Sequence, residues 1–137
     1  MARRIFLSFA AEDKDQVNGF RILRWNNQVD IDFFDSSLLT PVQSVNIEYI
    51  KRSILERMNN TSVTVVLIGP TTYKSAWVDW EIKQSISRGN GVLGIRLKDQ
   101  SNVPVPPAMQ IQTALVGNWS PHDFENWIEQ AAKLVGR

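Results

Sequence analysis

A tryptophan and a glutamate four residues apart, Trp77 and Glu81, form the pair of side chains in this sequence best suited to chemistry. They lie in the segment SAWVDWEIKQS, and a spacing of four places both on one face of a helix. A carboxylate beside an indole can stabilise a developing positive charge where water is excluded. The alternative is structural, with Trp77 covering the core and Glu81 solvated on the helix surface. These residues alone leave both interpretations open.

The composition argues against several other kinds of site. The 137-residue chain has no cysteine and one histidine, His122, so we expect no metal site and no serine or cysteine triad. Fifteen basic and fourteen acidic residues give a net charge of +1, which lacks the signature of nucleic-acid binding. No apolar run approaches the roughly 20 residues of a membrane span. We therefore expect neither nucleic acid nor a membrane as a partner, and a cytoplasmic location.

Short apolar runs alternate with helical patterns along the whole chain. The expected strands are residues 5–9, 29–34, 63–68, 92–97 and, more weakly, 114–116. Helical patterns cover residues 13–26, 47–58, 75–88 and 124–134, and the proline-rich residues 98–113 are expected to form a loop. This alternation predicts an α/β fold: one flavodoxin-like domain with a five-stranded parallel sheet in the order 2-1-3-4-5 and helices on both faces.

The helix that carries the Trp–Glu pair has readable ends and faces. Ser75 is suited to cap its start and Gly89 to end it, while Val78 and Ile82 recur on the face expected to pack on the sheet. In open parallel sheets, ligands bind beyond the carboxyl ends of the strands, where the strand order reverses. That point lies between the first and third strands, and the helix leaves the loop after the third. The sequence therefore predicts a site beside Trp77 and Glu81.

Two motifs resemble known sites but stand in the wrong context. The literal G-x-G-x-x-G of GNGVLG follows a helix and enters a strand, the reverse of a dinucleotide fingerprint, and is interpreted as a helix cap and tight turn. Glu12 and Asp13 after the first strand resemble the acidic pair of a phospho-receiver. However, the third strand ends in Gly69-Pro70, without a phospho-accepting aspartate.

The remaining pattern resembles the TIR domain superfamily. RRIFLSFAAEDKD is similar to the first box of TIR domains, and SAWVDWEIKQS to their Ser-x-Trp-x-x-x-Glu signature. VTVVLIGPTTYKSAWVDWEI followed by GVLGIRL resembles the TIR-like branch found in Thoeris antiphage-defence systems. The resemblance runs from Arg4 to about Leu97 and implies a single TIR-like domain over residues 1–137. One departure is the missing Arg-Asp…Pro-Gly box, of which only Pro41 stands in DSSLLTPVQSVN.

Many TIR domains consume NAD, and the resemblance implies the same activity here. Carried over to this sequence, it makes Glu81 the catalytic carboxylate and Trp77 a wall of the nicotinamide–ribose pocket. It also implies nucleotide contacts from further residues, namely Phe9, Ala10, Ala11, Asp35 and Ser36. NAD would be the substrate, so no separate cofactor is expected. The implied enzyme is an NAD+ glycohydrolase or ADP-ribosyl cyclase that acts in antiphage defence.

The product and the partners are less defined. Water as the acceptor would give ADP-ribose, whereas internal attack would give a cyclic form, and the sequence does not choose between them. The resemblance implies a nucleotide messenger that reaches a separate effector. The apolar loop of residues 35–44, with Leu38 and Leu39, is expected to mediate self-association that completes the site. The competing interpretation is a non-enzymatic TIR-like protein–protein interaction module.

Overall fold

The computed structural model describes residues 3–22, 33–35, 46–111 and 114–137, and its central element is a parallel sheet. Five strands lie in the order β2-β1-β3-β4-β5, and every neighbouring pair is parallel. The strands are β1 (Arg3–Phe9), β2 (Phe33–Asp35), β3 (Val63–Ile68), β4 (Gly91–Arg96) and β5 (Leu115–Asn118). The α/β class with a parallel sheet, predicted from the alternating pattern, is confirmed.

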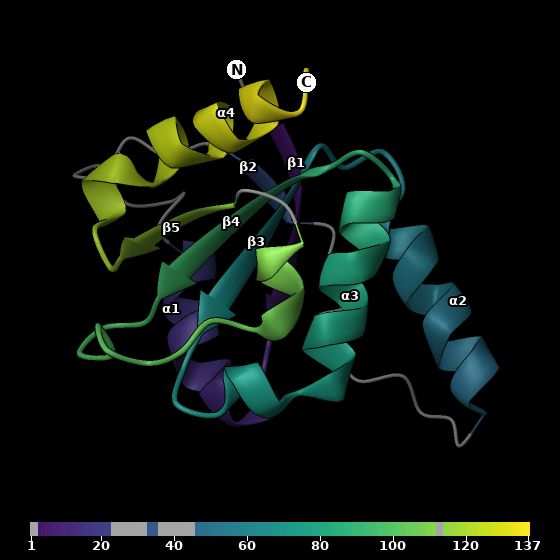
Figure 1. The fold of residues 1–137 in the computed structure, drawn as a ribbon, viewed down its shortest axis with the longest axis horizontal. Coiled ribbons are helices and arrows are strands. Elements are labelled where there is room, and N and C mark those ends of the chain that lie inside the picture. The colour runs from purple at the N-terminus through teal and green to yellow at the C-terminus, as the bar shows by residue number, and fades with distance from the viewer. Residues whose placement is uncertain (1–2, 23–32, 36–45, 112–113) are drawn as a thin grey trace.

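Helices cover both faces of this sheet (Figure 1). Val65 and Leu67 of β3 pack into the core beneath α1 and α4, whereas Val66 and Ile68 pack beneath α3. Because strand side chains alternate between faces, β3 is buried on both, as its continuous apolar sequence predicts. The helices are α1 (Lys14–Ile22), α2 (Ile47–Met58), α3 (Ala76–Ser87) and α4 (Phe124–Leu134).

The helix α3 begins and ends as the sequence predicts. The Ser75 hydroxyl accepts a hydrogen bond from the backbone N–H of Val78 at 3.2 Å, which caps the first turn. Val78 and Ile82 are buried against the sheet. After the last turn Gly89 has a φ of +79°, a left-handed conformation that favours glycine and stops the helix.

The glycines of GNGVLG serve packing. A Cβ on Gly91 would lie 2.3 Å from the backbone oxygen of Ala131, so β4 and α4 approach more closely than a side chain allows. A Cβ on Gly94 would lie 2.6 Å from Cε of Met109. Together with the helix-ending Gly89, these contacts account for all three glycines without a bound dinucleotide.

The boundaries of several elements differ from the predicted ones. α1 is preceded by a 3-10 helix, Ala11–Asp13, and the weak strand predicted at 114–116 spans Leu115–Asn118. Of the strand predicted at 29–34, only residues 33 and 34 lie within the described ranges, and β2 extends to residue 35. The predicted loop 98–113 contains a 3-10 helix, Pro107–Gln110, because Ala108 and Met109 are apolar enough to join the core under α3. No helix within the described ranges is both long and apolar enough to cross a membrane.

Candidate functional site

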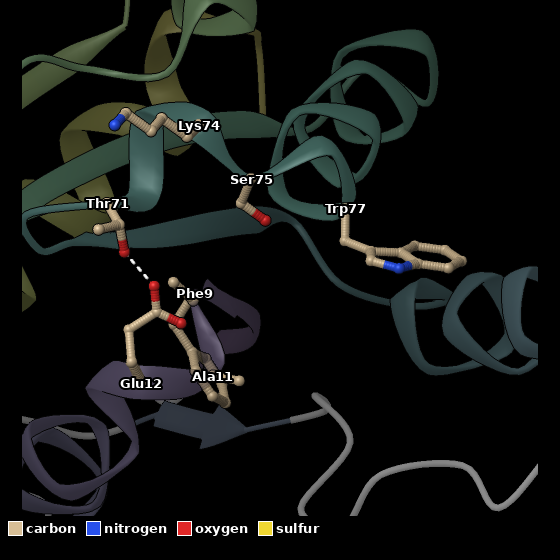
Figure 2. Close-up of a pocket in the computed structure, with 8 residues that line it drawn as sticks. Phe9, Ala11, Glu12, Thr71, Lys74, Ser75 and Trp77 are labelled. Atoms are coloured by element: carbon tan, nitrogen blue, oxygen red, sulfur yellow. Dashed lines mark hydrogen bonds between the residues drawn. The ribbon is translucent and has the colours of Figure 1, made fainter.

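A pocket of about 420 Å³ lies beyond the carboxyl ends of β1 and β3, where the sequence places the site (Figure 2). Its walls come from the end of β1, the turn after it, the loop after β3 and the first turn of α3. Figure 2 shows the Trp77 indole on one side of the pocket and the paired Glu12 and Thr71 on the other. The lining residues are Phe9, Ala10, Ala11, Glu12, Thr71, Lys74, Ser75 and Trp77.

Trp77 is held by its position in the first turn of α3, and its side chain is not buried. The residue is 40% exposed, and its ring meets that of Trp80 edge to face, with centroids 5.8 Å apart and planes at 89°. Trp77 also borders a second, smaller hollow of about 220 Å³ between α2 and α3. That hollow is lined by Ile47, Lys51, Ala76, Trp77 and Trp80. The indole therefore borders two separate spaces.

Glu81 lies one turn after Trp77 on α3 and is not among the residues that line the pocket. Its Oε1 accepts a hydrogen bond from the Ser8 hydroxyl at 2.8 Å. Burial raises the pKa of Glu81 to about 7, and the Ser8 hydrogen bond partly opposes that rise. The carboxyl group therefore changes its charge near neutral pH, and a shift of this kind is more common at functional sites than elsewhere.

Ser8 is a site residue that sequence reasoning did not single out. It ends the apolar part of β1, is fully buried and lies directly before Phe9, which lines the pocket. The available signal was its chemistry, because Ser8 is the only polar residue in the run IFLSF. Its partner is 73 positions away, so no local spacing could identify the contact.

The acidic pair after β1 is tied to two threonines after β3. Thr71 donates its hydroxyl hydrogen to Glu12, and this bond holds the pKa of Glu12 below its ordinary value. Thr72 lies next to Asp13, with 3.4 Å between Oγ1 and Oδ2. Burial raises the pKa of Asp13, and the neighbouring charge of Glu12 adds to the rise. These contacts join the two loops that border the pocket.

The structure brings most of the predicted site residues together. Phe9, Ala10, Ala11 and Trp77 line one pocket, and Glu81 does not line it but accepts a hydrogen bond from Ser8, the residue before Phe9. Asp35 is the last residue of β2, and Ser36 lies outside the described residues. The expected self-association loop also falls outside them from residue 36 onward. Within the described ranges, no group of three or more histidine, cysteine, aspartate or glutamate side chains could hold a metal ion.

Comparison with known proteins shows the family of this chain. Residues 6–102, which include every residue of the pocket, match the family model described as Thoeris protein ThsB, TIR-like domain. The chain is 39% identical over 104 residues to a curated protein of Bacillus cereus (strain MSX-D12), the "Putative cyclic ADP-D-ribose synthase ThsB1". That match covers 71% of this chain and 53% of the relative, so the chain spans about half the length of the curated relative.

A solved structure supports the fold independently. The crystal structure of the TIR domain of the Toll-related receptor TRR-2 from Hydra magnipapillata superposes with a TM-score of 0.57. The alignment covers 97% of this chain and 98% of that domain, at 17% identity, so it is evidence for the fold alone. The family model over residues 6–102 and the 39% identity to ThsB1 show that the chain belongs to the ThsB family of Thoeris TIR-like domains.

Proposed function

We propose that this chain cleaves the nicotinamide–ribose bond of NAD+ and releases nicotinamide together with an ADP-ribose product. The observation that carries the proposal is the Glu81 carboxyl group, held by Ser8 one helical turn after Trp77, which lines the pocket. The name of the Bacillus cereus relative, a putative cyclic ADP-D-ribose synthase, supports the same class of reaction. A cyclic product is accordingly the form we propose, made as a messenger for a separate effector in antiphage defence.

The chemistry needs a carboxylate more than it needs an acid. When the bond between the ribose C1′ and the nicotinamide nitrogen breaks, its electron pair leaves with the neutral nicotinamide. Positive charge is left on the ribose, as in the oxocarbenium-like transition states of glycoside hydrolysis. An ionised Glu81 would stabilise that charge, and the Trp77 indole would keep water away from it. An acceptor then forms the new bond to C1′ and loses its proton: water gives ADP-ribose, and a group within the molecule gives a cyclic product.

The direct test is the release of nicotinamide from NAD+ by the purified chain, followed by chromatography. Glu81→Gln removes the charge while keeping the shape, and we expect it to lower the rate roughly 10²-fold or more. Glu56→Gln makes the same change of charge at an exposed position on α2 and should leave the rate unchanged. A Glu81→Gln chain as active as the unmodified one would remove the proposed catalyst. Intact chain that releases no nicotinamide at any concentration would favour the interaction module instead.

Self-association through residues 35–44 stays part of the proposal. The apolar Leu38 and Leu39 are expected to order this loop over the site when two copies associate, which would exclude water from the ribose. Activity per molecule should therefore rise with protein concentration. Leu38→Asp should flatten that rise without altering the fold, as circular dichroism can check. Full activity that persists through a wide dilution series would contradict self-association while leaving the proposed chemistry intact.

A further inference from the structure

The Ser8 hydroxyl is a buried polar group that makes one side-chain hydrogen bond among the described residues. β1 is otherwise apolar at this end, and Ser8 is fully buried on the face of the sheet that α3 covers. Its hydroxyl donates to Glu81 Oε1 at 2.8 Å, and it makes no other side-chain hydrogen bond within the described residues. Burying a hydroxyl is unfavourable unless it is hydrogen-bonded, so the position makes physical sense only with the carboxyl group in place.

The two oxygens of Glu81 are not equivalent. Oε1 is occupied by Ser8, whereas Oε2 has no hydrogen-bond partner among the described residues. No described side-chain oxygen or nitrogen is both fully buried and without a partner, so Oε2 keeps contact with the solvent. One oxygen of the carboxyl group is therefore anchored to the sheet, and the other has no protein partner among the described residues.

We propose that Ser8 is a positioning residue for Glu81: by holding Oε1 it directs Oε2 toward the substrate and favours the ionised carboxylate. The inference rests on the proposed NAD cleavage for its catalytic meaning, although the hydrogen bond itself can be tested without substrate. Ser8 acts through Glu81 and makes no contact with NAD. A hydroxyl can donate to an ionised carboxylate and cannot be ionised itself at neutral pH, which suits this role.

Among the described residues, no charged side chain contributes to the shift in the pKa of Glu81. The pKa of Glu81 responds to burial first and to the Ser8 hydrogen bond second. Several charged groups on the elements around α3 have other partners in the structure, and Glu56 and Arg57 of α2 are exposed. Glu12 and Asp13 contact Thr71 and Thr72, Asp79 pairs with Lys83 at 3.0 Å, Lys51 lies over Trp80, Lys74 lies over Tyr73, and Arg96 donates to the Val103 carbonyl.

The chain supplies a matched control one helical turn away. Thr64 on β3 and Ser85 on α3 are both fully buried, and their hydroxyl oxygens lie 2.5 Å apart. Ser85 also donates to the backbone oxygen of Glu81 at 2.9 Å. This pair joins the sheet to the same helix but does not touch the Glu81 carboxyl group. Thr64→Val thus removes a comparable buried hydrogen bond without changing the environment of that carboxyl group.

The first experiment follows the titration of Glu81 by carbon NMR of the side-chain carboxyl groups, with Glu81→Gln used to assign the signal. Ser8→Ala should raise the pKa of Glu81 by about one unit or more, the scale of one hydrogen bond to a charged group. Ser8→Thr keeps the hydroxyl and should leave the titration near that of the unmodified chain. Thr64→Val should leave it unchanged. If Ser8→Ala folds poorly, Ser8→Cys keeps the volume and supplies only a weak donor.

The second experiment records nicotinamide release from NAD+ against pH for the same variants. Ser8→Ala should lower kcat at pH 7 about fivefold or more and shift the acidic limb of the profile to higher pH by about one unit, with KM nearly unchanged. Ser8→Thr should restore both, and Thr64→Val should change neither. A Glu81 titration that is indifferent to Ser8→Ala would overturn the inference. A shifted titration in a chain that releases no nicotinamide would instead refute the proposed function and leave the Ser8–Glu81 contact established.

Discussion

The carboxylate of Asp13 occupies the space that a side chain at position 69 would need. A Cβ on Gly69 would lie 2.2 Å from Asp13 Oδ2, far inside van der Waals contact. The Gly69 backbone N–H also donates to Thr72 Oγ1 at 2.8 Å, so the loop after β3 is built around the acidic residue after β1. This packing explains why a glycine stands where a phospho-receiver would carry its aspartate.

Gly69→Ala is therefore expected to lower the free energy of unfolding by about 1–3 kcal/mol, the usual cost of overpacking. Asp13→Ala vacates the space, so the double variant should be more stable than the sum of the two single effects predicts. Urea denaturation of the four proteins gives the coupling energy. Strictly additive losses would show that the two positions do not compete for one space.

Glu81→Gln should change stability in a way that depends on pH. The folded chain holds the Glu81 proton up to about pH 7, whereas the unfolded chain releases it near the ordinary value of 4.5. Between these values the unfolded chain binds fewer protons, so the free energy of unfolding falls as pH rises, by up to about 1.4 kcal/mol per unit. Above pH 7 the loss is complete.

Glutamine does not titrate, so the Glu81→Gln chain escapes this loss. Its stability relative to the unmodified chain should be greater at pH 8 than at pH 4.5, as urea titrations at the two pH values would measure. A difference that is the same at both pH values would contradict the raised pKa. Glu56→Gln, on the exposed face of α2, controls for the removal of one negative charge.

Trp77 and Trp80 should separate activity from stability. Trp77 is 40% exposed and borders the pocket, so Trp77→Ala should lower NAD cleavage more than it lowers stability. Trp80 does not line that pocket and packs against the buried cluster of Phe6, Ile54 and Met58. Trp80→Ala should cost about 2–4 kcal/mol of unfolding free energy, near the range for large core truncations. Thermal unfolding and nicotinamide release should be measured on both variants. Trp77→Ala should mainly lower activity and Trp80→Ala mainly stability, and equal effects of the two substitutions on both quantities would refute this prediction.

Two glycines offer opposite outcomes for one substitution. Gly91→Ala forces a methyl group toward the Ala131 backbone oxygen, which cannot move as a side chain can, and should lower stability by about 1–3 kcal/mol or more. Gly19 lies within α1, and a Cβ there would meet nothing within 4 Å. Gly19→Ala should raise stability by about 0.5–1 kcal/mol through helix propensity. Chemical denaturation distinguishes the signs, and a stabilised Gly91→Ala chain would contradict the close packing of β4 on α4.

The sequence predicts the fold well where one local pattern is sufficient. The apolar run of β3 identifies a strand buried on both faces, and Ser75 and Gly89 fix both ends of α3. The core role of Ala108 and Met109 was missed because three nearby prolines indicate a loop, and the apolar contact with α3 becomes evident only in three dimensions.

Part of the candidate site can also be predicted from the sequence. Helical spacing places Trp77 and Glu81 on one face, and topology places that face beside the crevice. Ser8 could not be assigned, because its role depends on a contact between β1 and α3 that the chain closes over 73 positions. A hydrogen bond between a strand and a distant helix produces no regular spacing in the sequence. Sequence patterns therefore do not reveal this part of a site.

Trp77 lines both the pocket and the hollow between α2 and α3, so its side chain is a wall that the two spaces share. A rotation of the Trp77 side chain that widened the pocket would narrow the hollow, and the reverse rotation would do the opposite. The two volumes, about 420 and 220 Å³, are thus linked through the torsion angles of a single residue. A substitution at Ile47 or Lys51 that repacks the Trp77 side chain is therefore expected to change the shape of the pocket, although neither residue lines it.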